Sequence, residues 1–114
     1  MKKILFILLL TIPFFGFGQD GYPEVKFVDG KPHGTFKFWY EKGKIKQIGE
    51  FDMGVMVGYW KFYNEDGKLW KEGNFKNGEK DGLWKYYDSN GKIVTEEEIW
   101  ENGKMIKFRE RTKN

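Results

Sequence analysis

Bulky aromatic and polar side chains alternate along most of this chain, with a period of two residues rather than 3.6. That spacing is typical of a β-strand with one buried face and one wet face. The alternation itself recurs with a period of 24, in the segments GTFKFWYEKGKI from Gly34, GYWKFYNEDGKL from Gly58 and GLWKYYDSNGKI from Gly82. Repetition at a short fixed period indicates stacked supersecondary units, whose product is usually a long binding surface.

Each repeat is interpreted as one β-hairpin. A Gly-containing dipeptide follows the first strand, at Lys42-Gly43, Asp66-Gly67 and Asn90-Gly91, and the last two are typical of a two-residue type I′ turn. The connections 54–58 and 78–82 are short enough to keep successive hairpins antiparallel neighbours. The predicted fold class is therefore all-β, a single elongated antiparallel sheet (a meander) of hairpin repeats, with no helix.

Counting outward from the turns predicts which residues oppose one another. In the second repeat the pairs are Trp60–Gly73, Lys61–Glu72 and Tyr63–Trp70; in the others they are Phe36–Gly49, Lys37–Ile48, Trp39–Lys46, Lys85–Glu96 and Tyr87–Val94. Opposed Lys and Glu contribute about 0.2–1 kcal/mol a pair. A large ring opposite Gly can lie over an otherwise bare strand position.

This register divides the side chains between two faces. The expected core face holds Phe36, Phe38, Ile45, Phe51, Trp60, Phe62, Leu69, Phe75, Trp84, Tyr86 and Ile93. The opposite face, which we expect to be wet, holds Trp39, Tyr63, Trp70 and Tyr87 among Lys37, Lys46, Lys61, Glu72, Lys85 and Glu96.

The ends of the array are less regular. Residues 22–33 are interpreted as a degenerate half repeat that precedes the repeats 34–57, 58–81 and 82–106. Residues 110–114 are interpreted as a charged tail. The third repeat has one extra residue, which predicts a β-bulge near Glu97-Glu98, with Ile99 or Trp100 in the position that Phe75 has in the second repeat. The strands near 24–28 and 105–109 are predicted to have open outer edges, so self-association through them is possible.

Residues 1–18 have the character of a secretory signal peptide. Lys2 and Lys3 precede a short apolar run, and Gly16 and Gly18 suit the small positions before a cleavage site between Gly18 and Gln19. The apolar run is shorter than the ~20 residues that span a bilayer. We therefore expect a secreted or periplasmic protein, with an uncleaved anchor as the alternative.

Composition excludes several kinds of chemistry. The chain has no cysteine, which rules out disulfides, thiol nucleophiles and Cys-based metal sites. Removing the leader takes away two basic and no acidic residues, so the net charge falls from +3 to +1 and gives little support to nucleic-acid binding. His33 is the only histidine and Ser89 the only serine, and both lie in expected connections. Successive strand residues alternate between faces, so only two side chains of Glu96-Glu97-Glu98 can point the same way, which argues against a divalent-cation site. The glycines recur singly and do not form a phosphate-binding loop, so a nucleotide site has no support. We expect no enzyme, no cofactor and no metal site.

The unit G-x-W-x-x-Y-x-x-x-G-x-L followed by F-x-x-G resembles the MORN-repeat variant family. The second repeat matches best, at Gly58, Trp60, Tyr63, Gly67, Leu69, Phe75 and Gly78; the first departs, with Phe36 in the Trp position and Trp39 in the Tyr position. The resemblance covers residues 22 to about 106. It implies an elongated sheet of hairpins used for protein or membrane contact, and many bacterial members carry the label of YwqK-type toxin–antitoxin antitoxin.

The expected wet face supplies the candidate binding residues, because aromatic side chains with polar neighbours are typical of interfaces. They are Trp39, Lys46, Lys61, Tyr63, Trp70, Lys85 and Tyr87. The leading hypothesis is a secreted, non-enzymatic module that binds a partner protein. The alternatives are an envelope module that contacts lipid headgroups or glycan, and a cytosolic antitoxin, which requires an unused signal peptide.

Overall fold

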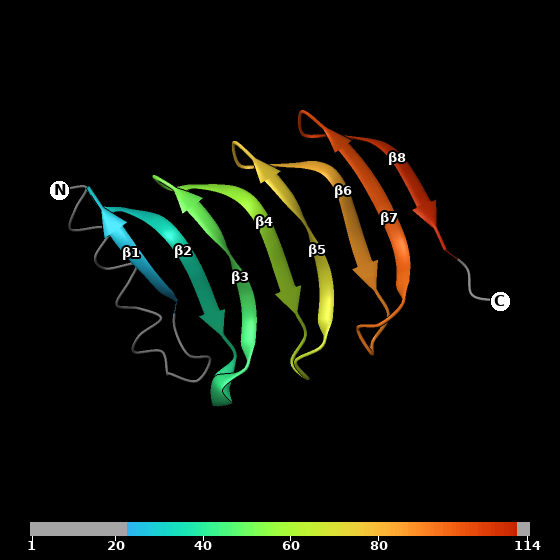
Figure 1. The fold of residues 1–114 in the computed structure, drawn as a ribbon, viewed down its shortest axis with the longest axis horizontal. Helices are drawn as coiled ribbons and strands as arrows, with labels where there is room; N and C mark the ends of the chain where they lie inside the picture. Colours follow the sequence, from blue (N-terminus) through green and yellow to red (C-terminus); the bar gives the residue numbers. More distant parts are fainter. Residues whose placement is uncertain (1–22, 112–114) are drawn as a thin grey trace.

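The chain forms one antiparallel sheet of eight strands, each paired with its neighbours in the sequence (Figure 1). The structure is a computed structural model, and it describes residues 23–111. The strands are β1 (Glu24–Val28), β2 (Lys31–Trp39), β3 (Ile45–Asp52), β4 (Val55–Tyr63), β5 (Leu69–Lys76), β6 (Glu79–Tyr87), β7 (Val94–Glu101) and β8 (Lys104–Glu110). The predicted all-β meander is confirmed. The expected signal peptide and the last three residues of the expected tail lie outside the described residues.

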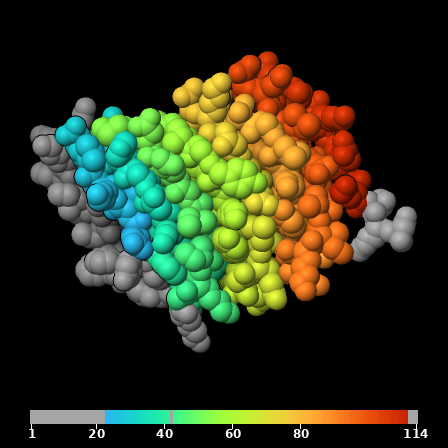
Figure 2. All heavy atoms as spheres, in the orientation of Figure 1, coloured from blue at the N-terminus to red at the C-terminus, as the bar shows by residue number. Residues whose placement is uncertain are grey.

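The sheet is a single curved layer. The strands bow in the same sense, with β1 and β8 at opposite ends of the array (Figure 1). The space-filling view shows the strands as successive bands in sequence order (Figure 2). Any core must therefore form among side chains on one face of a single layer.

Tight two-residue turns join β1 to β2, β3 to β4, β5 to β6 and β7 to β8. Both central residues have positive φ in each of them, at Asp29-Gly30, Met53-Gly54, Asn77-Gly78 and Asn102-Gly103. Positive φ at both positions defines the type I′ turn, whose twist matches that of paired strands. The type I′ turns therefore lie in the segments that were predicted to connect successive hairpins. The prediction of type I′ turns at Asp66-Gly67 and Asn90-Gly91 was wrong.

The other end of each hairpin has a wider loop. In the loop of the second repeat Asn64 closes a five-residue connection, because its Oδ1 accepts the N–H groups of Asp66 and Lys68 at 2.9 and 3.0 Å. Gly67 has positive φ there but Asp66 does not. In the first repeat the corresponding connection contains a 3-10 turn, Glu41–Gly43, which was not predicted from the sequence.

A bulge beside each wide loop shifts the register by one residue. The central pairs Trp60–Gly73 and Lys61–Glu72 are confirmed, but Tyr63 opposes Leu69 and leaves Trp70 unpaired. In the same way Trp39 opposes Ile45 and leaves Lys46 unpaired. Directly opposed residues share a face, so these two pairs put Ile45 and Leu69 on the face of Trp39 and Tyr63. Their assignment to the core face was wrong.

The extra residue of the third repeat lies in its hairpin loop. Six residues, 88–93, connect Tyr87 to Val94 there, and the β6–β7 register then runs without interruption through Glu97 and Glu98. The predicted bulge near Glu97-Glu98 and the predicted Lys85–Glu96 pair were therefore wrong, since Lys85 opposes Glu97.

The observed register also places Trp100, Glu96 and Ile93 of the third repeat. Trp100 opposes Gly82 as Phe75 opposes Gly58, so Trp100 occupies the position of Phe75. Glu96 opposes Tyr86 and so lies on the core face, and its assignment to the wet face was wrong. Ile93 lies in the loop and is 52% exposed, so its assignment to the core face was wrong.

The core is a row of rings on one face, which we call the aromatic face. Its members are Phe36, Phe38, Phe51, Trp60, Phe62, Phe75, Trp84 and Tyr86. Trp60 and Trp84 have no exposed surface. Trp60 meets the rings of Phe51 and Phe75 edge-on, with centroids 5.4 and 5.9 Å apart. Seven of the rings, all except Tyr86, form a continuous row through edge-on, tilted and stacked contacts.

Two glycines make room for the tryptophans. A Cβ built on Gly49 would lie 2.0 Å from the Trp60 indole, and one on Gly73 would lie 2.2 Å from the Trp84 indole. The indole therefore lies directly against the backbone of the preceding strand. This close approach lets a single layer bury a large side chain completely.

Candidate interaction surface

The second face of the sheet carries both charged and aromatic side chains, and we call it the mixed face. Its centre is formed by Tyr59, Lys61, Tyr63, Glu72, Leu83, Lys85 and Tyr87, with Trp39 toward the β2 end. These residues alternate along β4, β5 and β6, so the strand period alone brings them to one side.

A nearly buried carboxylate lies in the middle of the mixed face. Glu72 is 9% exposed and stands between Lys61 on one neighbouring strand and Lys85 on the other. The Tyr87 hydroxyl donates a hydrogen bond to it. Burial and this hydrogen bond raise the pKa of Tyr87 well above its ordinary value.

The same carboxylate acts on Tyr59. Burial, followed by the charge of Glu72, raises the pKa of Tyr59. Both phenols therefore stay protonated over the physiological range and remain hydrogen-bond donors. The centre of the mixed face is thus a fixed arrangement of donors and charges.

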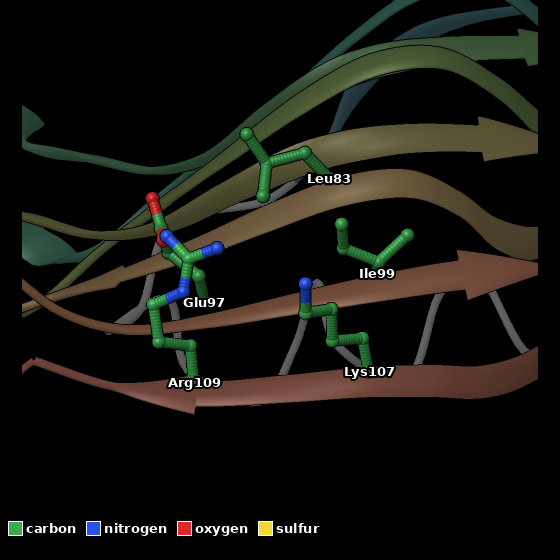
Figure 3. A pocket seen from close by; sticks show the side chains of 5 residues that line it. All are labelled: Leu83, Glu97, Ile99, Lys107 and Arg109. Carbon is green, nitrogen blue, oxygen red and sulfur yellow. The ribbon is translucent and has the colours of Figure 1, made fainter.

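Apolar surface is exposed on either side of this centre. Tyr59 is 50% exposed and Leu83 44% exposed, although each stands two residues from a lysine of the same face. A shallow groove of about 180 Å³ continues from Leu83 toward β8, with Ile99 beside it and Lys107 and Arg109 along one side (Figure 3). Arg109 pairs with Glu97 at 3.1 Å. The mixed face therefore combines aliphatic and aromatic contact area with basic groups.

Lysines lie over the rings on the outer side of the aromatic face. The Lys71 amino group is 4.3 Å from the centroid of Trp70 and 4.9 Å from that of Phe62. Burial and the nearby charge of Lys80 lower the pKa of Lys71, while Glu98 acts in the opposite direction. Lys46 lies 5.2 Å from the centroid of Phe38 in the same arrangement. Each contact is a cation–π pair.

Glu98 occupies the position in β7 that Gly73 has in β5. Its carboxylate accepts hydrogen bonds from Trp100 Nε1 at 2.7 Å and from the Tyr86 hydroxyl at 3.1 Å. Lys80 lies 3.5 Å from it. The row of rings thus ends in a satisfied polar cluster toward β7.

The structure brings five of the seven predicted binding residues together. Trp39, Lys61, Tyr63, Lys85 and Tyr87 lie on the mixed face. The bulges direct the other two, Lys46 and Trp70, to the aromatic face, where both join the lysine–ring contacts. Their assignment to the wet face was wrong, because it relied on the register that the bulges shift.

Sequence reasoning also missed members of the mixed face. Tyr59 and Leu83 precede the buried tryptophans of their strands and therefore point away from the core. The strand period already contained this signal. Nothing in the repeat pattern, in contrast, marked Glu98 as the acceptor of the polar cluster.

The single histidine has a structural partner. His33 lies in β2, not in a connection, and its Nδ1 accepts the N–H of Met53 at 3.1 Å. Within residues 23–111 no three His, Asp or Glu side chains gather as a metal site. A membrane-spanning helix is likewise absent from this range, whose helical structure is the three-residue turn after β2.

Fold and surface together define a class: a β-repeat protein with one face closed by its own rings and one mixed face. Segments 32–53, 56–77 and 80–99 match the family described as MORN repeat variant, and together they cover more than half of the 114 residues. The chain belongs to this family. No curated protein matches it, and neither does any solved structure. Repeats of the family commonly serve as protein- or membrane-binding modules and generally not as enzymes.

Proposed function

We propose that this protein is an exported, non-enzymatic module that binds a partner protein on its mixed face. The observation that carries the proposal is the exposure of Tyr59 and Leu83 among lysines, on the face that the core does not use. Aromatic residues are enriched in the buried centres of interfaces, where a few of them carry most of the binding energy. Tyr59 is therefore expected to be the main anchor, and the exposed Leu83 adds apolar contact area.

Charge favours a partner surface with carboxylates. Lys61 and Lys85 flank Glu72 on the mixed face, and Lys107 and Arg109 border the groove beside Leu83. An acidic and apolar segment laid across β4, β5 and β6 would meet both features. Such charges mainly raise the association rate and set orientation, while the apolar anchors supply affinity.

The chain offers a matched pair of variants for the test. Tyr59 and Trp70 are 50% and 48% exposed, but they belong to opposite faces. Proteins crosslinked to the chain in its native envelope would be identified, purified and titrated calorimetrically against wild type, Tyr59→Ala and Trp70→Ala. We expect Tyr59→Ala to weaken binding about tenfold or more, and Trp70→Ala to leave it unchanged within about twofold. Equal losses, or a loss with Trp70→Ala alone, would refute docking on the mixed face.

The lysine–ring contacts favour a second function, binding to lipid headgroups through the aromatic face. Trp70 is half-exposed beside Lys71, a combination that suits the interface of an anionic membrane. Co-sedimentation with phosphatidylserine vesicles at low salt, lost at high salt and weakened by Trp70→Ala but not by Tyr59→Ala, would support it. Absence of sedimentation at every salt concentration would remove it. Glycan binding stays a prediction.

Export is a separate part of the proposal. N-terminal sequencing of the protein purified from its host should begin at Gln19. A sequence that begins at Met1 would contradict cleavage and return the cytosolic antitoxin role to consideration.

A further inference from the structure

The two end strands of the sheet, β1 and β8, have complementary positions in the repeat. Odd-numbered strands end in a tight type I′ turn and even-numbered strands begin after one. β8 is an even strand, so a ninth strand in the same array would be odd and would run in the direction of β1. Among residues 23–111 no strand pairs with the outer side of β1 or of β8.

Both end strands expose apolar side chains. All seven residues of β8 are exposed, and Met105, Ile106 and Phe108 are between 49% and 55% exposed. Four of the five residues of β1 are exposed, and Val28 is 40% exposed. An edge with exposed apolar residues and a row of backbone donors and acceptors is a template for another strand.

We infer that β8 of one molecule pairs with β1 of a second copy, so that the sheet continues head to tail in the phase of the repeat. The register follows from pairs already present within the sheet. Phe36 opposes Gly49, Trp60 opposes Gly73 and Trp84 opposes Glu98. Phe108 lies one repeat period after Trp84 and is its equivalent in β8. Val25 lies one period before Gly49 and is its equivalent in β1. The intermolecular pair at this position is Phe108 with Val25.

The neighbouring pairs define the electrostatics of the contact. Arg109 is placed opposite Glu24, so its guanidinium stands between that carboxylate and the Glu97 carboxylate that it already binds. Lys107 is placed opposite Lys26, which is unfavourable. One strand pair is a small interface, so association is concentration-dependent. Because the two surfaces differ, the contact is heterologous and builds open chains rather than closed dimers.

Cysteine trapping tests the register directly, because the chain has no cysteine of its own. In the purified protein, the variant Val25→Cys/Phe108→Cys should give a ladder of disulfide-linked dimers and larger species under mild oxidation. The control Val25→Cys/Arg109→Cys places its thiols on opposite faces and should give no ladder. Ladders of equal yield in both variants, or no ladder in the first, would overturn the inference.

Mixing the single variants tests the head-to-tail polarity. Val25→Cys mixed with Phe108→Cys should give a disulfide-linked dimer that contains one copy of each and nothing larger. Dimers formed by either single variant alone would show that like edges meet, and would overturn head-to-tail pairing.

A gain of association provides the second measurement. Lys26→Glu replaces the unfavourable pair by Glu opposite Lys107 and should raise the association constant roughly two- to tenfold in sedimentation velocity. Lys68→Glu makes the same charge change in an exposed loop away from both edges and should have no effect. If Lys26→Glu associates no more strongly than Lys68→Glu, the register is wrong.

Discussion

Substituting Ala for Gly49 should remove the space that the Trp60 indole occupies. The added Cβ would lie 2.0 Å from Cδ2 and 2.2 Å from Cε2 of the ring. Carbon atoms pack at about 3.5–4.0 Å, so the ring must move by roughly 1.5 Å. Gly49 does not have the left-handed backbone conformation that only glycine adopts easily. The cost is therefore steric and falls on the indole.

The magnitude follows from what the indole contacts. Its Nε1–H donates to the Val57 carbonyl at 3.0 Å, and a buried donor left without an acceptor costs about 1–3 kcal/mol. Displacement also disturbs the edge-on contacts with Phe51 and Phe75, each worth about 0.5–1.5 kcal/mol. We expect a loss of roughly 3–5 kcal/mol in the free energy of unfolding. For a domain of this size the loss lowers Tm by roughly 15–30 °C.

Thermal and urea unfolding followed by circular dichroism measure the loss. Gly67→Asn is the control, because no atom lies within 4 Å of the Cβ position of Gly67 and Asn tolerates its positive φ of 83°; it should cost less than about 1 kcal/mol. In a Trp60→Leu background, Gly49→Ala should cost less than about 1 kcal/mol, since the clashing ring is gone. A stable Gly49→Ala variant, or the same cost with and without the ring, would refute the reasoning.

Three further predictions concern a turn, a buried carboxylate and a loop. Met53 has a φ of 46° in a type I′ turn, so Met53→Asn should stabilise the fold by about 0.5–1 kcal/mol, and a lower urea midpoint would contradict this. Tyr87→Phe removes the donor to the nearly buried Glu72 and should cost about 1–3 kcal/mol in urea unfolding; a loss under about 0.5 kcal/mol would show that the hydrogen bond is unimportant. Asp88 accepts the N–H of Lys92, which lowers the pKa of its carboxyl below the ordinary 3.8. This support of the loop is therefore fully present above pH 3.8 and is lost as the pH falls through the lowered pKa, so the amide shift of Lys92 should titrate with a midpoint below 3.8 and not above it.

The central register could be predicted from the sequence because two signals agree there. Large rings and glycines return in the same phase in successive repeats, and the pairs Phe36–Gly49 and Trp60–Gly73 follow from that phase. A shift of one residue would have turned every ring to the wrong side. The sequence pattern therefore specifies the register in the middle of the β2–β3 and β4–β5 pairs. In the β6–β7 pair Glu98 stands in place of the glycine, and the predicted pair Lys85–Glu96 was wrong.

The turns could not be placed in the same way, because each repeat contains two candidate dipeptides. By residue type alone, Asp66-Gly67 and Asn77-Gly78 are equally suited to a type I′ turn. The side chain of Asn64 decides between them, since its hydrogen bonds to two loop N–H groups hold the first site open as a wider loop. The resulting bulge then turns Trp70 toward Lys71, and with it one of the predicted binding residues.

The extent of the core depends on which residue stands in the middle of each odd strand. Where that residue is Gly49 or Gly73, a tryptophan lies against the backbone and is fully buried. In β7 the residue is Glu98, and Phe108, which stands opposite it, stays 49% exposed. Burial is thus concentrated around β4 and β6 and falls toward β8, although the strands pair along the whole array. The row of buried rings thus ends where Glu98 stands in place of glycine, and Met105, Ile106 and Phe108 of β8 remain about half exposed. Pairing with a second copy depends on this exposed apolar surface of β8.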